Sequence, residues 1–350
     1  MKKMFRNLLW SALLCATASC SQEVLVEEVD VKVQLKDATI RFSDSKPENS
    51  TRASLNATQG FPIGTEIGVY AFQHSTGSST DQIFNNQKVT KITDDAWAYS
   101  PLRYWNVTST YDFHAIYPYS TSAYTFDNST GNFSINGFVV ADAADEQTDV
   151  MVAQKNNTHP FNLVELQFDH LLSNVNFYFK TVNTFDFAAG VSKVEVVSFD
   201  VVGLNSTGNY LQNGFSAVGR VLGAWTVQGT DVYDHPVVTT GEVTSATQTI
   251  ALSTDLLLLP QDLTDAAKAV CLSYRIHYTD GTSCFLQKEV PLAKAAYSGG
   301  DLTEWKPNSI YNYTLAVNPA INADGTSNVI DFTASVEEWE QETDAEIPVK

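Results

Sequence analysis

The chain has 350 residues and a formal net charge of −19, from 21 basic and 40 acidic side chains. This length suits two domains or one large domain. The acidic balance excludes a typical nucleic-acid binder, which needs a basic surface to displace counterions from phosphates, and it excludes a polybasic membrane patch. Hydrophobic residues make up 43% of the chain, which is ample for packed cores and argues against disorder.

The first twenty residues have the pattern of a bacterial lipoprotein signal. Three basic residues precede an apolar stretch, 8–16, that is too short for a permanent transmembrane helix. Small residues then lead to Cys20. We interpret residues 1–19 as a signal peptide and Cys20 as the lipidated residue, held on the outer membrane by acyl chains such as palmitate. The alternative is ordinary secretion with an unmodified Cys20.

The rest of the chain predicts an all-β sandwich fold. Apolar and polar residues alternate with period two in short windows that turn-forming clusters separate. The predicted strands are residues 66–72, 111–117, 175–179, 194–202, 270–277, 310–317 and 330–336. Clusters of Gly, Asn and Ser predict turns, including one at 203–208. Short helices are expected only at 264–269 and 293–296.

A polar stretch at 154–160 is the predicted domain boundary. It separates an N-terminal sandwich, 53–160, from a C-terminal sandwich, 161–350. Residues 20–52 form an acidic and then Lys/Ser/Pro-rich linker with one predicted strand at 29–35.

Two cysteines remain after the signal, Cys271 and Cys284. They flank Asp280-Gly281, which predicts a two-residue hairpin turn that pairs Cys284 with His277. Six strand residues then separate the two sulfurs by about 20 Å. A disulfide needs Cα atoms within about 7 Å. We therefore predict two unpaired thiols that act as small core hydrophobes.

No pattern indicates catalysis or a metal site. The six histidines are scattered singly, without the spacing of a zinc site. No nucleophile elbow or phosphate-binding glycine loop is present. Acidic residues cluster at Asp142, Asp145, Glu146 and Asp149, but their spacing does not match a calcium loop. We expect no enzyme, cofactor or metal ion, and a solvated acidic loop.

Several motifs occur in an order that is similar to a known family. They are the lipoprotein box, Thr51-Arg52-Ala53 before GTEIGVY at 64–70, YW at 104–105 before YDFHAIYP at 111–118, DVMVA at 149–153, FDHLLS at 168–173, YNYTL at 311–315 and VEEW at 336–339. In this order the chain resembles the fimbrillin family, whose members build type V pili on anaerobic bacteria. The resemblance covers almost the whole chain.

The resemblance implies two transthyretin-like β-sandwich domains in tandem and a structural subunit of a cell-surface fimbria. The partners would be other fimbrial subunits, with a host protein or glycan as the target of adhesion. In the family, a protease cuts after an arginine near the N-terminus. This releases the first strand and opens a groove that a strand from a neighbour fills.

Two arginines are candidates for that cut. Arg52 in the polar sequence Ser50-Thr51-Arg52-Ala53 matches the family best, and such a stretch is accessible to a protease. The alternative for Arg52 is an ordinary surface arginine. Arg41 is the second candidate, although its apolar neighbours, Ile40 and Phe42, predict that it is buried.

The candidate donor strand lies near the C-terminus. Its apolar residues occupy alternate positions and therefore share one face of a strand; they are Ile330, Phe332, Ala334 and Val336. The equal alternative is an ordinary last strand of the second sandwich.

A second function remains open at this point, a surface glycan-binding lipoprotein. Such a protein would use exposed aromatic platforms, for which Trp97, Trp105 and Trp225 are the candidates. The pilus interpretation instead places Trp105 in the core. An N-terminal strand at a removable edge position would favour the pilus subunit.

Overall fold

The computed structural model describes residues 38–44, 60–75, 80–94, 96–127, 130–182, 190–214, 222–237, 241–297, 300–319 and 330–339. The signal peptide, Cys20, Arg52 and the predicted strand at 29–35 lie outside these ranges. The described part is all-β, as expected, with two single-turn 3-10 helices, η1 (Ala144–Glu146) and η3 (Leu292–Lys294). Within it, no helix has the length and apolar character needed to cross a membrane.

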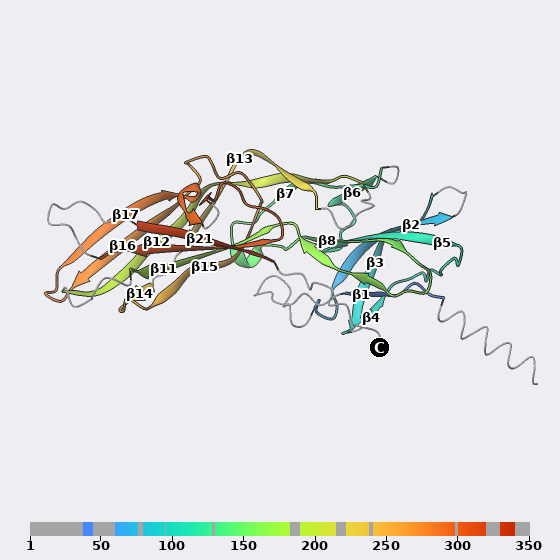
Figure 1. Ribbon diagram of the computed structural model, residues 1–350, viewed down its shortest axis with the longest axis horizontal. Helices are drawn as coiled ribbons and strands as arrows, with labels where there is room; N and C mark the ends of the chain where they lie inside the picture. The colour runs from blue at the N-terminus through green and yellow to red at the C-terminus, as the bar shows by residue number, and fades with distance from the viewer. Residues whose placement is uncertain are drawn as a thin grey trace, which may run out of the picture.

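The N-terminal half of the chain forms a six-stranded antiparallel sheet, which we call the first sheet. Its order is β10-β8-β5-β2-β3-β4, at the right of Figure 1. The strands are β2 (Glu66–Ser75), β3 (Thr80–Thr93), β4 (Ala96–Ala98), β5 (Ser109–Tyr117), β8 (Met151–Thr158) and β10 (Phe168–His170). A short parallel pair, β1 (Phe42–Asp44) with β9 (Val164–Leu166), accompanies it.

Both faces of the central strands of the first sheet are buried, because the side chains of one strand alternate between two apolar clusters. On β2, Ile67, Val69 and Ala71 belong to one cluster, which we call the inner core. Tyr70 and Phe72 belong to another, which we call the junction core. This double burial explains why β2 has an almost continuous apolar sequence.

The remaining strands form two sheets that enclose the largest core. The second sheet has the order β15-β11-β20-β21-β18-β19, and β11 and β20 run parallel. Its strands are β11 (Ser173–Thr181), β15 (Thr249–Leu258), β18 (Ala296–Tyr297), β19 (Gly300–Asp301), β20 (Ser309–Val317) and β21 (Ile330–Glu338). The third sheet has the order β17-β16-β12-β7-β6, with β13 and β14 also paired to β12. Its strands are β6 (Tyr124–Asp127), β7 (Asn132–Val139), β12 (Val191–Gln212), β13 (Ala224–Val237), β14 (Gly241–Val243), β16 (Ala269–Tyr278) and β17 (Ser283–Pro291).

Strand β12 has 22 residues and connects the two halves of the molecule. Its first half pairs with β14 and β16, and its second half pairs with β7 and β13. The predicted turn at 203–208 is therefore wrong. Gly203 has a φ of +77° and lies at an irregularity in the pairing with β13 between Val201 and Leu204. A Cβ there would lie 2.0 Å from the carbonyl oxygen of Ala267, so the glycine permits a bulge rather than ending the strand.

The β6–β7 hairpin lies between β5 and β8 in the chain but belongs to the third sheet. Figure 1 shows β6, β7 and β13 along one side of the molecule, extending from the third sheet toward the first. In the junction core, Phe133, Ile135 and Tyr210 pack with side chains of the first sheet. Burial of both partners therefore joins the first sheet to the third.

Most of the polar stretch at 154–160, where we predicted the domain boundary, lies in β8. The chain continues through β9 and β10, which pairs with β8 in the first sheet. Within this stretch, buried Gln154 and Thr158 flank exposed Lys155 and Asn157, so the polar composition marks the end of a strand and not a linker.

The hairpin between β16 and β17 differs from its prediction by one residue. Tyr278 N donates to Thr282 O, so the loop has three residues, with Gly281 at a φ of +86°. Cys284 therefore faces Ile276, and Cys271 faces Glu289. Neither thiol is in a disulfide, as predicted, but both are half-buried rather than in the core.

The two expected helices are also corrected. Residues 264–269 form a turn and the start of β16, while only a single 3-10 turn, η3, occurs near 293–296. The predicted strands at 66–72, 111–117, 175–179, 194–202, 270–277, 310–317 and 330–336 are all confirmed, within longer strands.

Truncation of a junction-core side chain should destabilise the protein. Ile135 on β7 is 2% exposed, whereas Val139 on the same strand is 62% exposed. We expect Ile135→Ala to reduce the free energy of unfolding by about 2–5 kcal/mol, measured by urea denaturation. Val139→Ala is the control and should change it by less than about 0.5 kcal/mol. Equal effects would contradict the assignment of this core.

Candidate functional site

Residues 38–44, which we call the N-terminal segment, lie beside β9 and the loop at 103–105. Figure 1 shows β1 close to β3 and β4 of the first sheet. The segment is extended, and its β1 part pairs parallel to β9. Its backbone hydrogen bonds run from Ile40 N to Arg103 O (3.0 Å), from Trp105 N to Ala38 O (2.8 Å) and from Val164 N to Arg41 O (2.9 Å). Strand β1 could not be predicted from the sequence, because three residues are too few to give a period.

The N-terminal segment completes the inner core. Ile40 and Phe42 are 0% and 2% exposed, and both belong to this core. The ring of Phe42 lies 5.7–5.8 Å from three other rings, each in an edge-to-face arrangement, those of Phe84, Tyr99 and Phe113. Rings at these distances contribute packing energy beyond their buried area. Loss of the segment would expose these three aromatic side chains to water.

Asp44 ends the segment in a buried ion pair. Its Oδ2 lies 2.8 Å from the Nζ of Lys91, and their side chains are 4% and 1% exposed. The same oxygen accepts from Phe61 N at 3.1 Å, and Oδ1 accepts from Trp97 Nε1 at 3.0 Å. The carboxylate thus has three donors, which is what a buried charge needs to offset its desolvation.

Arg41 is exposed, so the prediction that it is buried is wrong. In an extended segment, consecutive side chains point in opposite directions, and Arg41 therefore points away from the core that Ile40 and Phe42 enter. Its carbonyl still accepts a hydrogen bond from Val164 N. A protease would have to pull the segment out of the sheet before it could cut there.

Arg52 lies outside the described residues, in the connection between Asp44 and Gly60. Phe61 is the first inner-core residue that follows this connection in the chain. It is 3% exposed and packs on Trp97, with ring centroids 5.8 Å apart. A cut after Arg52 would therefore leave the N-terminal segment attached only by non-covalent contacts.

The candidate donor residues lie on β21 in the second sheet of their own chain. β21 pairs along its length with β20 and touches β18. Phe332 is 5% exposed and belongs to the largest core, and Ile330, Ala334 and Val336 pack against that core. This is the arrangement of an ordinary last strand.

The C-terminal end of β21 is fixed to the first sheet. Trp339 stacks on His170, with ring centroids 3.6 Å apart and planes 5° apart. His170 Nδ1 lies 2.7 Å from Asp149 Oδ2, so this acidic residue is buried and not part of a solvated loop. Trp339 N also donates to Asn308 O at 3.0 Å.

The tryptophans proposed as glycan platforms are not exposed. Trp97 and Trp105 are 9% and 7% exposed and belong to the inner core. Trp225 is half-buried, packs against the junction core and donates its Nε1–H to Leu171 O at 2.7 Å. A sugar ring needs an open aromatic face, so none of the three serves as a platform.

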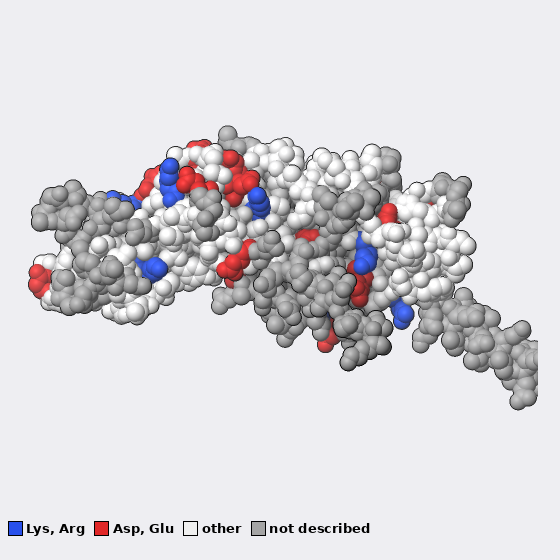
Figure 2. Space-filling view, viewed as in Figure 1, with Lys and Arg blue, Asp and Glu red and all other residues white. Residues whose placement is uncertain are grey.

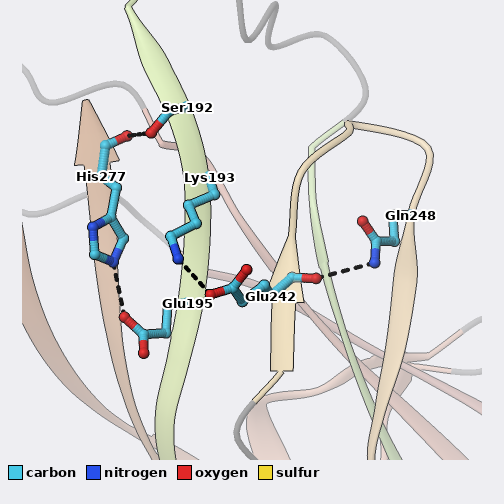
Figure 3. Close-up of polar contacts among 6 residues, drawn as sticks. All are labelled: Ser192, Lys193, Glu195, Glu242, Gln248 and His277. Atoms are coloured by element: carbon cyan, nitrogen blue, oxygen red, sulfur yellow. Dashed lines mark hydrogen bonds and ion pairs between the residues drawn. The ribbon is translucent and has the colours of Figure 1, made fainter. Parts of the chain in front are cut away.

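Several charged side chains on the described surface form ion pairs between neighbouring strands. Figure 2 shows that much of one face is uncharged and that acidic side chains gather mainly over the C-terminal sheets. Figure 3 shows one polar network, in which Lys193 pairs with Glu242 and His277 Nε2 lies 2.8 Å from Glu195. The hydrogen bond from His277 lowers the pKa of Glu195. The network ties β14 and β16 to β12, and no three metal-ligating side chains gather among the residues described.

Comparisons with known proteins agree with this architecture. A family model described as fimbrillin-like matches residues 51–339. A solved structure of a candidate cell adhesion protein from Bacteroides uniformis is 17% identical, covers 87% of this chain and 100% of its own, and has a TM-score of 0.50. A candidate adhesion protein from Bacteroides ovatus (15%, 87% and 98% coverage, TM-score 0.48) and a fimbrilin from Porphyromonas gingivalis (10%, 87% and 98%, 0.41) are also similar. No curated protein matches.

Loss of the Asp44 carboxylate should destabilise the protein. Asp44→Ala would leave Lys91 as a buried charge without its partner, and we expect a loss of about 3–5 kcal/mol in the free energy of unfolding by urea. The control is Ser43→Ala, which changes the neighbouring, half-buried residue and should cost less than about 1 kcal/mol. Similar small losses in both variants would show that the ion pair does not stabilise the segment.

His114 should make stability depend on pH. Burial lowers its pKa from 6.5 to about 4. As the pH falls from 6.5 to 4, His114 therefore takes up a proton in the unfolded chain but stays neutral in the folded protein. The free energy of unfolding falls by about 3 kcal/mol over this range. Relative to His114→Asn, the wild type should lose this amount between pH 7 and pH 4 in urea titrations. A difference that stays constant with pH would contradict the assignment.

Proposed function

Because this chain belongs to the fimbrillin-like family, we propose that it is a structural subunit of a cell-surface fimbria that supports adhesion and that assembles by strand exchange. It has no catalytic role in this proposal. Its partners are other fimbrial subunits, either copies of this chain or different ones. The two transthyretin-like domains of the proposal are the first sheet with the N-terminal segment, and the second and third sheets with their shared core.

The observation that carries the assembly proposal is the position of the N-terminal segment. Residues before 45 complete a core whose other residues come from position 61 onward. The covalent connection between the two parts passes through Arg52. Cleavage there would let the segment leave and open a groove lined by Phe84, Tyr99 and Phe113.

An open groove of this kind would bind another strand. Its apolar lining and unpaired backbone groups are unfavourable in water, and an extended segment from a neighbour satisfies both. The family model supports this boundary, because its match begins at residue 51, next to the proposed cut, and omits the N-terminal segment.

Export as a lipoprotein fits the same scheme. We propose that Cys20 carries the lipid that holds the precursor on the outer membrane. The cut after Arg52 then separates the folded body from its anchor and opens the groove in one step.

The donor of the exchanged strand is proposed to lie near the C-terminus of the neighbouring subunit. The residues are Ile330, Phe332, Ala334 and Val336, whose alternation suits a groove with apolar pockets. In the described state they pack on the largest core of their own chain, so donation requires that β21 leave β20.

Limited trypsin digestion tests the cleavage site. We expect wild-type protein to be cut first after Arg52 and then to form oligomers that give a ladder in mild detergent. Arg52→Gln should remove both the cut and the ladder. The matched control, Arg41→Gln, should behave as wild type because the peptide bond at Arg41 is held in the sheet.

The products are identified by mass spectrometry of the released N-terminal fragment and by gel analysis. A first cut after Arg41 would contradict the assignment of the site. Cut protein that stays monomeric would contradict polymerisation by strand exchange.

A further inference from the structure

A buried ammonium group, that of Lys91 on β3, lies beneath the N-terminal segment. The Lys91 side chain is 1% exposed, and its Nζ lies 2.8 Å from Asp44. Among the residues described, Asp44 is the only acid within ion-pair distance of this ammonium group. When the segment leaves, the carboxylate leaves with it, whereas Lys91 remains on β3.

Two further donors for the carboxylate also stay behind. Trp97 Nε1–H points at Oδ1, and Phe61 N–H and Lys91 Nζ share Oδ2. The ammonium also lies 5.8 Å from the centre of the Trp97 ring. All three donors follow Arg52 in the chain. They form a preorganised carboxylate cradle, defined as Phe61 N, Lys91 Nζ and Trp97 Nε1, within the part of the protein that cleavage retains.

The cradle has a fixed register with the apolar pockets. Ile40, Phe42 and Asp44 occupy alternate positions of one extended segment, so they share a face. The first two enter the inner core, and the third reaches the cradle. A strand that fills both pockets therefore places its residue two positions later against Lys91.

We propose that this cradle selects the incoming strand, which must carry an Asp or Glu two residues after the second of two alternate apolar residues. The inference rests on the proposed function, because it concerns the occupant of the groove after cleavage. The occupant is an extended strand of a second subunit with the pattern apolar-x-apolar-x-acid. The apolar pockets alone would accept many strands of suitable shape. The cradle adds the requirement for a negative charge.

The cradle selects mainly by disfavouring strands that lack an acidic residue at this position. A strand with Ser, Asn or Ala at that position would bury the Lys91 ammonium without a counter-charge, and one with Lys or Arg would place two positive charges together. Buried unpaired charges are strongly disfavoured, and rejecting a wrong partner in this way is a common source of specificity. Because the pair is buried, salt would screen it little.

The chain's own candidate donor strand has the required pattern. On β21, Ala334 and Val336 are alternate apolar residues, and Glu338 follows two positions later. A second copy of this chain can therefore supply a strand with an acid in register. The pattern Ile40-x-Phe42-x-Asp44 of the N-terminal segment differs mainly in the size of its apolar residues.

A peptide exchange measurement tests the proposal. The full-length protein, cut after Arg52, is mixed with a fluorescent peptide of residues 36–46, and replacement of the resident segment is followed by anisotropy. We expect the Asp44→Asn peptide to bind about 10- to 100-fold more weakly than the parent peptide, as for a hydrogen-bonded charge pair that loses one charge. The Arg41→Gln peptide is the matched control and should bind as the parent does.

Variants of the protein locate the effect at the cradle. With Lys91→Met, the preference for the acidic peptide should fall to less than about threefold, whereas Lys91→Arg should retain it. If Lys91→Met does not fold, the binding of the parent and Asp44→Asn peptides to the wild-type protein and to Lys91→Arg still tests whether a carboxylate is required.

The outcomes separate this inference from the proposed function. Equal binding of the Asp44 and Asp44→Asn peptides by the wild-type protein would overturn the carboxylate requirement and leave strand exchange intact. Failure of every peptide to exchange would overturn the groove as an acceptor site, and with it both proposals.

Discussion

The inner core of the first sheet is closed by side chains of the N-terminal segment, whereas the other residues of that core follow from position 61 onward. Ile40 and Phe42 fill the space between aromatic rings, and Asp44 neutralises a lysine that is otherwise fully enclosed. The apolar contacts make the segment adhere, while the ion pair fixes its register. In the proposed strand exchange, the same features would also determine what can replace the segment, because Lys91 and the rings lie outside it.

The first sheet can lose this cover without losing its other support. Its opposite face packs on the junction core, which contains residues of β7 and β12. Strand β12 continues into the largest core, and Trp339 stacks on His170 at the end of β10. Because β7 and β12 pack on one face of the sheet, we expect it to stay folded when the seven-residue segment leaves its other face. The packing on the opposite face is the physical reason why we expect the open groove to persist until a partner strand binds.

The strands at 111–117 and 310–317 could be predicted because apolar residues at every second position are typical of a strand with one face more deeply buried than the other. Three features could not. Gly203 resembles a turn residue but serves a bulge inside β12, and a local pattern does not distinguish the two. The loop of the β16–β17 hairpin differs by one residue, which shifts every pair. The N-terminal segment is too short for a period, and the Asp44–Lys91 pair joins residues 47 positions apart, which no local pattern reveals.

A reversible tether on the N-terminal segment tests its role most directly. Ser43 and Glu165 are paired neighbours on β1 and β9, at a strand spacing of about 4.8 Å that suits a disulfide. In the Ser43→Cys, Glu165→Cys variant, cut after Arg52, oligomers should be absent under oxidising conditions and should form on reduction, as judged by gel filtration. Oligomers that form equally in the oxidised protein would contradict the claim that this segment occupies the site of assembly.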